Sequence, residues 1–95
     1  MSIGQNEFAG SGYVGKIQYY SDKKFCRFDL IIPREKNNKS RDSFTCSLTD
    51  AAAQEFHTTI KQGDIVEVFG RLQNNKANGN HYITIRLQAF TKHKP

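Results

Sequence analysis

The sequence predicts an all-β protein, a five-stranded Greek-key barrel with one short α-helix between the third and fourth strands. The first observation is that short stretches alternating between apolar and polar residues recur along the chain, as in strands buried on one face. The second is a single helical stretch, residues 51–60, in which Ala53, Phe56 and Ile60 fall on one side. A lysine and a glycine follow it, which is typical of a helix end.

The first two strands are predicted over residues 8–20 and 25–32. Three glycines in the first indicate a bent or bulged strand, with Tyr13, Ile17 and Tyr19 on one face and Val14 on the other. Alternation in the second strand places Cys26, Phe28, Leu30 and Ile32 inward, and Phe25, Arg27, Asp29 and Ile31 outward.

The third strand is predicted over residues 43–49, where Phe44, Cys46 and Leu48 alternate with hydroxyl side chains, and Thr49 or Asp50 is expected to cap the helix. The fourth and fifth strands are predicted over residues 65–72 and 82–90. Between the strands, residues 34–42 are expected to form a mobile polar loop and residues 73–80 a turn. The alternation directs Ile83, Ile85, Leu87 and Ala89 inward, and Phe69, Tyr82 and Phe90 outward.

A barrel with these five strands and a helix in this place is the OB fold. The fold commonly uses the outer face of its second and third strands to hold oligonucleotides. Residues 1–95 are expected to form one domain, with frayed ends at 1–7 and 91–95.

The charge of the chain favours a polyanionic partner. With 14 Lys and Arg against 9 Asp and Glu, the formal net charge is +5. Nucleic acid is favoured over a membrane surface, because the sequence has no long apolar run and no amphipathic membrane helix. No signal peptide is recognisable at the start, so the expected location is the cytoplasm.

The residue types needed for catalysis or metal binding do not cluster in the sequence. Cys26 and Cys46 fall at apolar strand positions, where buried reduced thiols are expected. His57, His81 and His93 are scattered without paired ligand spacing, so no metal is expected. We also expect no cofactor and no catalytic residues, since no phosphate-binding glycine loop or paired carboxylates are present.

Several segments together resemble the OB domain of bacterial single-stranded-DNA-binding proteins and their short relatives. They are Tyr13-Val14-Gly15-Lys16-Ile17, residues 25–30, Ile60-Lys61-Gln62-Gly63-Asp64 and Gly70-Arg71-Leu72. The resemblance implies single-stranded DNA as partner, contacts with replication proteins such as helicase, primase or polymerase, and a homodimer or higher oligomer. The chain departs from that family at three positions that usually carry stacking aromatics, here Ser43, Thr49 and Ala77, and residues 92–95 are basic where the family has an acidic tail. The connection of residues 21–24 is also shorter than in tetramer-forming members, which argues against a tetramer.

Exposed aromatic residues interleaved with cations are the arrangement that sequence-tolerant binding of a single strand requires. Two alternatives stay open: Phe69 with Ile31 could form a dimer patch, and the basic loop could be merely solvated. The candidate nucleic-acid-binding residues are Lys16, Tyr20, Phe25, Arg27, Arg34, Lys36, Lys39, Arg41, Arg71, Lys76, Tyr82 and Arg86.

The leading hypothesis is therefore a non-catalytic OB-fold protein that binds single-stranded DNA with little sequence preference, in replication, recombination or transfer of a mobile element. One alternative is a protein-interaction subunit of a replication or primosome complex. A third is an RNA-binding OB module, which contacts to the 2′-hydroxyl would distinguish.

Overall fold

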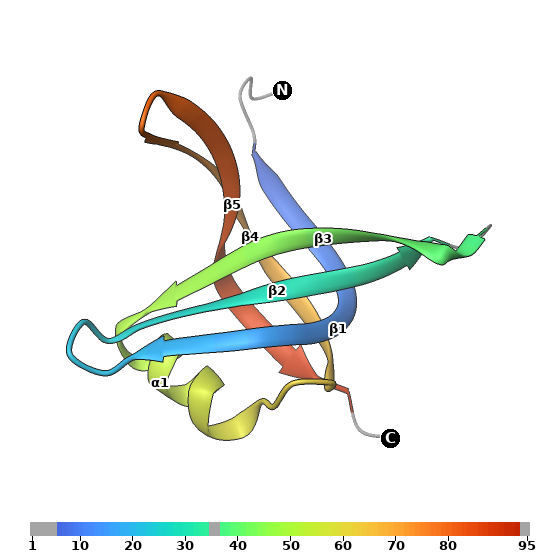
Figure 1. Cartoon of the computed structure of the whole chain (residues 1–95). Helices are drawn as coiled ribbons and strands as arrows, with labels where there is room; N and C mark the ends of the chain where they lie inside the picture. Colours follow the sequence, from blue (N-terminus) through green and yellow to red (C-terminus); the bar gives the residue numbers. More distant parts are fainter. Residues whose placement is uncertain (1–5, 35–36, 94–95) are drawn as a thin grey trace, which may run out of the picture.

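The computed structural model describes residues 6–34 and 37–93, and the side chains of residues 34 and 37–40 are not described. Along the chain the elements are β1 (Glu7–Tyr20), β2 (Phe25–Arg34), β3 (Asn37–Thr49), α1 (Asp50–Thr59), β4 (Ile65–Ala77) and β5 (Asn80–Lys92). The strands close into a barrel in the order β1-β2-β3-β5-β4 (Figure 1). This confirms the predicted OB fold.

The barrel closes through one short parallel contact. Cys46 and Ser47 of β3 pair with Ile85 and Arg86 of β5, whereas the other neighbouring strands pair antiparallel. Helix α1 connects β3 to β4 and covers the end of the barrel that lies lowest in Figure 1. The position of this helix follows from its apolar face, which has no other place to be buried.

The core joins the inward side chains of the strands to the apolar face of α1. Ala53 and Phe56 are fully buried and Ile60 nearly so, as predicted. The ring of Phe56 stacks on Phe28 of β2 with 4.4 Å between centroids, and meets the edge of Phe90 at 5.1 Å. Pairs of aromatic rings in these geometries stabilise a core beyond the area that they bury.

The helix begins without the side-chain cap that the sequence predicts. Thr49 is the N-cap residue, but its hydroxyl accepts no hydrogen bond from the helix. Instead, Asp50 adopts a left-handed φ of 56°, and its amide donates to the carbonyl of Lys24 at 2.8 Å. The β1–β2 turn therefore anchors the first residue of the helix, whereas a side-chain cap would have accepted from the amide of Ala51 or Ala52.

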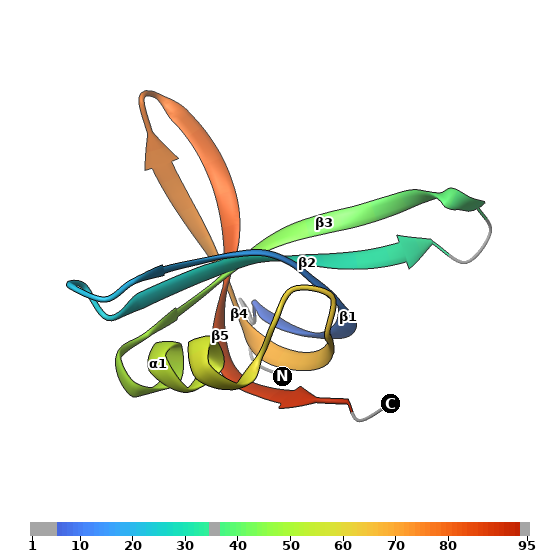
Figure 2. The same ribbon diagram turned by 60° about the horizontal axis from the view of Figure 1, so that its bottom comes forward.

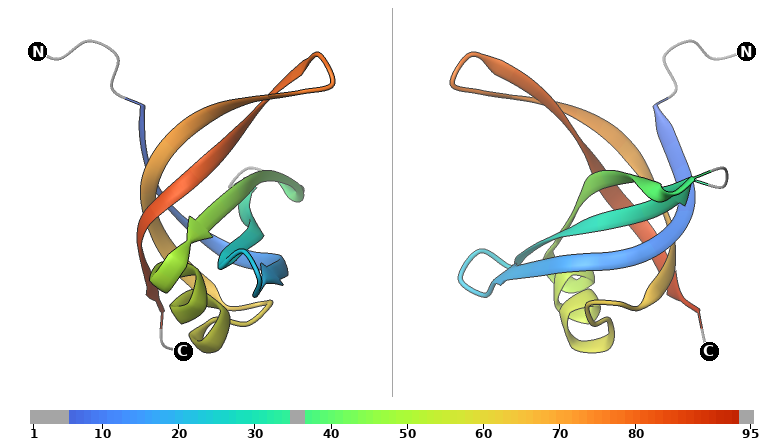
Figure 3. Two further views of the ribbon diagram at one scale, coloured as in Figure 1. Left: turned by 90° about the vertical axis from the view of Figure 1, so that its left-hand side faces the viewer. Right: turned by 45° about the vertical axis from the view of Figure 1, so that its right-hand side comes forward.

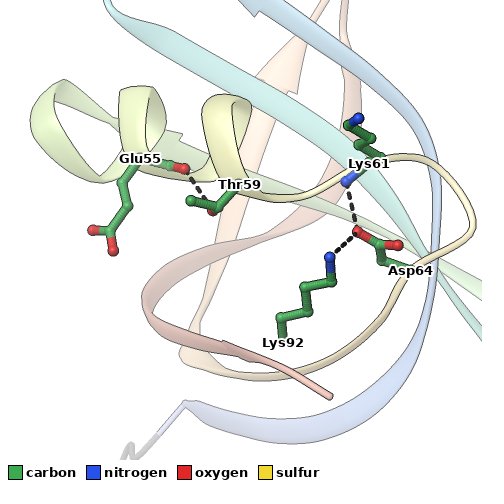
Figure 4. Close-up of polar contacts among 5 residues, drawn as sticks. All are labelled: Glu55, Thr59, Lys61, Asp64 and Lys92. Carbon is green, nitrogen blue, oxygen red and sulfur yellow. Dashed lines mark hydrogen bonds and ion pairs between the residues drawn. The ribbon is translucent and has the colours of Figure 1, made fainter. Parts of the chain in front are cut away.

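The turn between α1 and β4 is held by backbone and side-chain contacts (Figure 4). The C-cap residue of the helix is Ile60, in an extended conformation, and Gly63 takes its positive φ of 96° later, in the turn. The amide of Gly63 donates to the carbonyl of Val14 at 2.8 Å. The carboxylate of Asp64 accepts from the amide of Lys61 at 2.8 Å and lies 3.4 Å from Lys92 Nζ. The Lys61 hydrogen bond, with a smaller effect from Lys92, lowers the pKa of Asp64.

A bulge in β1 confirms the predicted irregularity and changes which side chains face inward. Val14 pairs with Leu30 and Ile17 with Phe28, so two residues of β1 lie opposite one residue of β2. Val14, Ile17 and Tyr19 consequently all contact the core, and Tyr13 is 45% exposed. The predicted faces of Tyr13 and Val14 are therefore wrong, because alternation does not continue through a bulge.

A second irregularity corrects the prediction for Phe90. Phe69 pairs with Ala89, but the next residue, Gly70, pairs with Leu87, which leaves Gln88 as an extra residue in β5. This bulge turns Phe90 inward against Phe56 and exposes Ala89, the reverse of the predicted arrangement.

Two hairpins extend beyond the barrel as arms (Figures 2 and 3), where the sequence predicts a loop and a turn. The β2–β3 arm includes residues 32–34 and 37–42, and the β4–β5 arm residues 73–84. The turn of the β4–β5 arm is only Asn78-Gly79, both with positive φ, as in the two-residue turns that suit twisted hairpins. Ile83 and Phe44, both predicted to face the core, lie outside it. Ile83 is 64% exposed, and Phe44 is 36% exposed, with its ring centroid 5.6 Å from that of Phe8.

Both cysteines are buried free thiols, as predicted. Burial raises the pKa of Cys26 to about 11, and burial together with the nearby Asp29 charge raises that of Cys46 to about 12. The C-terminal end of β5 is paired: Thr91 and Lys92 pair with β4, although the sequence predicts fraying there. Within the described residues, no three His, Cys, Asp or Glu side chains cluster to hold a metal ion. No helix of the described chain has the length and apolar character needed to span a membrane.

Candidate nucleic-acid interface

A groove runs along the outer face of the barrel between β1, β2, β3 and the β4–β5 arm. It consists of two hollows, of 330 and 190 Å³, that share Arg27, Tyr82 and Thr84. The first hollow is completed by Lys16, Gln18, Phe28, Asp29 and Thr45, and the second by Phe25, Ser47, Thr49, Gln73, Asn75 and Arg86. These two hollows are called the groove below.

Strand pairing explains why residues distant in sequence meet in the groove. Arg27 of β2 pairs with Ser47 of β3, and Ser47 pairs with Arg86 of β5. Paired residues of a sheet share a face, so these three side chains form one row across the outside of the barrel. Because neighbouring strands lie about 4.8 Å apart, the backbones of Arg27 and Arg86 are roughly 10 Å apart.

The two arginines of this row are held by neutral partners. Arg27 Nη2 donates to Gln18 Oε1 at 2.9 Å, and Arg86 Nη2 donates to Thr49 Oγ1 at 3.5 Å. Both contacts are exposed to solvent. Neither interaction neutralises a guanidinium, so both keep their positive charge and further donors for a phosphate.

The residues that line the groove carry a net positive charge. Lys16, Arg27 and Arg86 contribute three charges, and Asp29 is the acidic residue among the described lining residues, which leaves a sum of +2. Lys92 forms an ion pair with Asp64, and His93 Nε2 lies 3.0 Å from Glu67 Oε1, both where the start of β4 meets the end of β5 and away from the groove.

Aromatic rings border the same groove. Tyr82 is 49% exposed on the β4–β5 arm, while Phe25 is half-buried on β2. The ring of Tyr20, which is 38% exposed, lies 6.1 Å from that of Phe25, and its hydroxyl is 3.5 Å from Gln18 Oε1. The groove thus combines ring faces, on which bases can stack, with cations that can contact phosphates.

The structure brings together five of the predicted site residues in the lining of the groove: Lys16, Phe25, Arg27, Tyr82 and Arg86. Tyr20 is at its border, next to Phe25, and Arg71 pairs directly with Arg86 on the outer face of β4.

The remaining predicted cations are on the two arms or outside the described residues. Lys76 is exposed near the tip of the β4–β5 arm, opposite His81. Arg41 is exposed on the β2–β3 arm, opposite Pro33. Arg34 and Lys39 belong to the strands of that arm, with side chains that are not described, and Lys36 lies outside the described residues. The structure therefore gives these arm residues no defined place in the groove.

Sequence reasoning missed the uncharged polar residues of the groove. Thr45, Ser47 and Thr49 form the hydroxyl face of β3, and alternation alone identifies that face. The same alternation places Gln18 on the face of Lys16 and Tyr20, and Thr84 on that of Tyr82 and Arg86. Gln73 and Asn75 are on a strand that the sequence predicted as turn material, and Asn75 Nδ2 donates to Thr84 Oγ1 at 2.9 Å across the arm.

Comparisons with known proteins find solved structures of similar fold. No protein-family model matches the sequence, and no curated protein is a match. A small single-stranded DNA-binding protein from Streptomyces coelicolor has a TM-score of 0.70 at 18% identity, covering 97% of this chain and 96% of its own. The mitochondrial single-stranded DNA-binding protein Rim1 from S. cerevisiae has a TM-score of 0.77 at 12% identity, covering 96% and 97%.

A third similar structure is the dimeric N-terminal domain of PriB from Thermoanaerobacter tencongensis. Its TM-score is 0.70 at 18% identity, and the match covers 95% of this chain and 98% of that domain. At these identities the likeness is one of fold. Over nearly its whole length the chain has the OB fold of these three proteins.

Proposed function

We propose that this protein binds single-stranded DNA without catalysis and with little sequence preference. The observation that carries the proposal is the groove, where exposed Tyr82 stands beside Arg27 and Arg86, two arginines with neutral partners. Stacking on aromatic rings tolerates any base, since every base has a π-face, and arginine contacts to phosphate carry no sequence information. The fold shared with two single-stranded DNA-binding proteins supports the same function.

Binding proceeds in two physical steps. The cations attract the phosphate backbone and displace its counterions, and bases then stack on Tyr82, Phe25 or Tyr20. If Lys16, Arg27 and Arg86 each neutralise one phosphate, the logarithm of affinity falls with that of salt with a slope of about −2. That slope corresponds to a loss of about twentyfold between roughly 50 and 200 mM salt.

Fluorescence anisotropy with a labelled thymidine oligomer at several salt concentrations tests the proposal. We expect tighter binding to single strands than to a duplex of the same length, and similar binding to oligomers of different sequence. Equal or tighter binding to the duplex, or an affinity independent of salt, would contradict the proposal. An RNA oligomer of matched sequence tests the RNA alternative, because only contacts to the 2′-hydroxyl separate the two.

We further propose that the protein self-associates through a second surface. The outer face of β1, β4 and β5 carries Ala9, Phe69 and Ala89 in one cross-strand row, over a hollow of 470 Å³. Tyr13 and Ile65 form a second apolar pair on this face, beyond the polar pair Ser11–Glu67. The predicted partner of Phe69, Ile31, is opposite Tyr13 on β2. We call these six apolar residues the apolar strip.

The occupant that we propose for the apolar strip is a second copy of this chain. Tyr13, Ile65 and Phe69 are 45%, 40% and 39% exposed on one face, and large exposed apolar side chains favour association. A dimeric structure of similar fold, the PriB domain, supports the same assembly. Light scattering at increasing protein concentration is expected to give twice the monomer mass or more, and a constant monomer mass would contradict this assembly.

As a wider context, we propose that the protein acts in the cytoplasm in DNA replication, recombination or mobile-element transfer, beside replication proteins such as helicase, primase or polymerase. The groove supports this role because such processes expose single strands. If oligonucleotides fail to bind while a replication protein binds stoichiometrically, the protein-interaction alternative would replace it.

A further inference from the structure

A second aromatic site lies outside the groove, where β1 meets α1. The rings of Tyr19 and His57 are stacked, with centroids 4.2 Å apart and planes at 7°. Tyr19 is half-buried and packs against the core, whereas His57 is exposed on the helix. The pair is therefore a planar platform with its inner ring fixed and its outer ring accessible to solvent.

The platform borders a hollow that carries two cations. The hollow has a volume of 390 Å³ and is lined by Lys16, Ile17, Tyr19, His57, Ile60, Lys61 and Gln62. This volume is in the range of sites that hold small organic ligands. Lys16 and Lys61 approach it from two different elements, the bulge of β1 and the turn after α1.

The backbone around this hollow is fixed. The amide of Val14 donates to the carbonyl of Asp64, and the amide of Gly63 donates to the carbonyl of Val14, both at 2.8 Å. These bonds tie the α1–β4 turn to β1 just before the bulge that carries Lys16. The two lysines are consequently mounted on backbone segments that hold each other in place.

Lys16 connects this hollow to the groove, because its side chain lines both. A nucleic-acid strand that leaves the groove past Lys16 reaches the hollow that the Tyr19–His57 platform and Lys61 line. The hollow offers a ring face for a base and two cations, Lys16 and Lys61, for phosphates.

We propose that the Tyr19–His57 hollow is an additional nucleotide subsite, where a base stacks on His57 while Lys16 and Lys61 contact the flanking phosphates. The inference rests on the proposed function, since it extends the path of a strand already bound in the groove. It requires that only oligomers long enough to continue past Lys16 use the platform, so its contribution depends on oligomer length.

The test compares short and long thymidine oligomers, of roughly six and sixteen nucleotides, which span the site sizes of OB folds. We expect His57→Ala to weaken binding of the long oligomer by at least about fivefold, the lower limit of one stacked base, and to leave the short one unchanged. His57→Phe, which keeps a ring on the helix, should restore binding of the long oligomer. Lys61→Gln should reduce the salt slope for the long oligomer by about 0.7.

Control measurements separate the subsite from a merely structural ring pair. His93→Ala removes an exposed histidine that bridges to Glu67 at 3.0 Å, away from the hollow, and should change neither affinity. If His57→Ala weakens both oligomers equally, or binds the long one as the wild type does, the subsite is overturned.

Photo-cross-linking of a long oligomer with 5-iodouracil at successive positions gives an independent readout on the wild-type protein, should His57→Ala fail to fold. Cross-links to the peptides that contain Tyr19 or His57 support the subsite, and cross-links confined to groove peptides contradict it. If the wild type binds neither oligomer, the proposed function itself fails, and that result is distinct from failure of the subsite alone.

Discussion

The groove and the apolar strip are two exposed faces of the same barrel with opposite chemistry. The groove presents Arg27, Arg86 and Tyr82 among hydroxyl and amide side chains, with a sum of +2 over its charged residues. The apolar strip presents Phe69 between two alanines of the paired strands, and the charged residue beside it on the same face of β4 is Glu67. The exposed rings therefore have different proposed roles: stacking on bases in the groove and packing against a second copy at the apolar strip.

The strand that joins the two faces shows how the difference arises. On β5, Arg86 faces the groove and Ala89 belongs to the apolar strip, so both point outward. Regular alternation would put residues 86 and 89, three apart, on opposite faces of the strand. The extra residue, Gln88, resets the alternation between them. One bulge thus allows a single strand to contribute a cation to one surface and a small apolar residue to another, while Leu87 stays buried.

The largest expected effect comes from removing both arginines of the groove. Arg27→Ala combined with Arg86→Ala should weaken binding of single-stranded DNA by about a hundredfold, since a hydrogen bond to a charged group contributes roughly 1.5–3 kcal/mol. Anisotropy titrations at one fixed salt concentration measure it.

The matched control for the arginine pair is Lys23→Gln with Lys24→Gln, which removes the same charge from the exposed β1–β2 turn. We expect that variant to lose only a small factor through long-range electrostatics. Comparable losses in both variants would show that net charge, and not the groove, governs binding.

The next largest effect is predicted for the bulge that separates the two faces. A Cβ at Gly70 would collide with the backbone of Arg86 and lie 2.9 Å from its carbonyl carbon. Gly70→Ala should therefore lower the free energy of unfolding by about 2–3 kcal/mol, because backbone cannot move aside as a side chain can. Urea denaturation measures this change.

Gly10→Ala is the control for this prediction, because its Cβ would meet side chains and not backbone: the ring of Phe8 at 3.0 Å, which can shift, and Ile32 Cδ1 at 3.8 Å. A loss below about 1 kcal/mol is expected there. If the two variants are equally stable, close approach of β4 and β5 at Gly70 does not determine the bulge.

A smaller effect should distinguish the exposed ring of the groove from that of the apolar strip. Tyr82→Ala is expected to weaken DNA binding by about 1–3 kcal/mol, the contribution of one stacked base, whereas Phe69→Ala should leave it unchanged. Tyr82→Phe keeps the ring face and should bind as the wild type does. In light scattering the pattern should reverse, with Phe69→Ala reducing self-association and Tyr82→Ala leaving it intact.

The smallest effect concerns pH and lies outside both faces. Because hydrogen bonding from Lys61 lowers the pKa of Asp64 in the folded state, its carboxylate stabilises the fold above its usual pKa of 3.8. That contribution is lost as pH falls through the lower folded value. Asp64→Asn should thus lower the melting temperature slightly at pH 7, with a difference that shrinks below about pH 4.

Asp22→Asn, in the exposed β1–β2 turn, is the control carboxylate and should leave the melting temperature unchanged at both pH values. A difference between wild type and Asp64→Asn that stays constant down to pH 2 would contradict ionisation as the cause.

The sequence predicted the helix to within one residue, because Ala53, Phe56 and Ile60 form an unbroken apolar face. It also identified five groove residues, since Phe25 and Arg27 alternate with buried neighbours on β2. It failed for Phe90 and Tyr13, which lie beside bulges, and for Ile83 and Phe44, which extend beyond the core.

The amino-acid order by itself determined the number and order of the strands, the apolar face of the helix and the positive charge, because these depend on local periodicity and composition. Tertiary structure alone decided how far the hairpins extend, where the bulges reset alternation, and which cations meet Tyr82. The physical reason is that a polar segment becomes a strand when a partner supplies its hydrogen bonds, as Gln73 and Asn75 obtain from β5. The partners lie on opposite sides of the Asn78-Gly79 turn, so the pattern of either segment alone does not show this pairing.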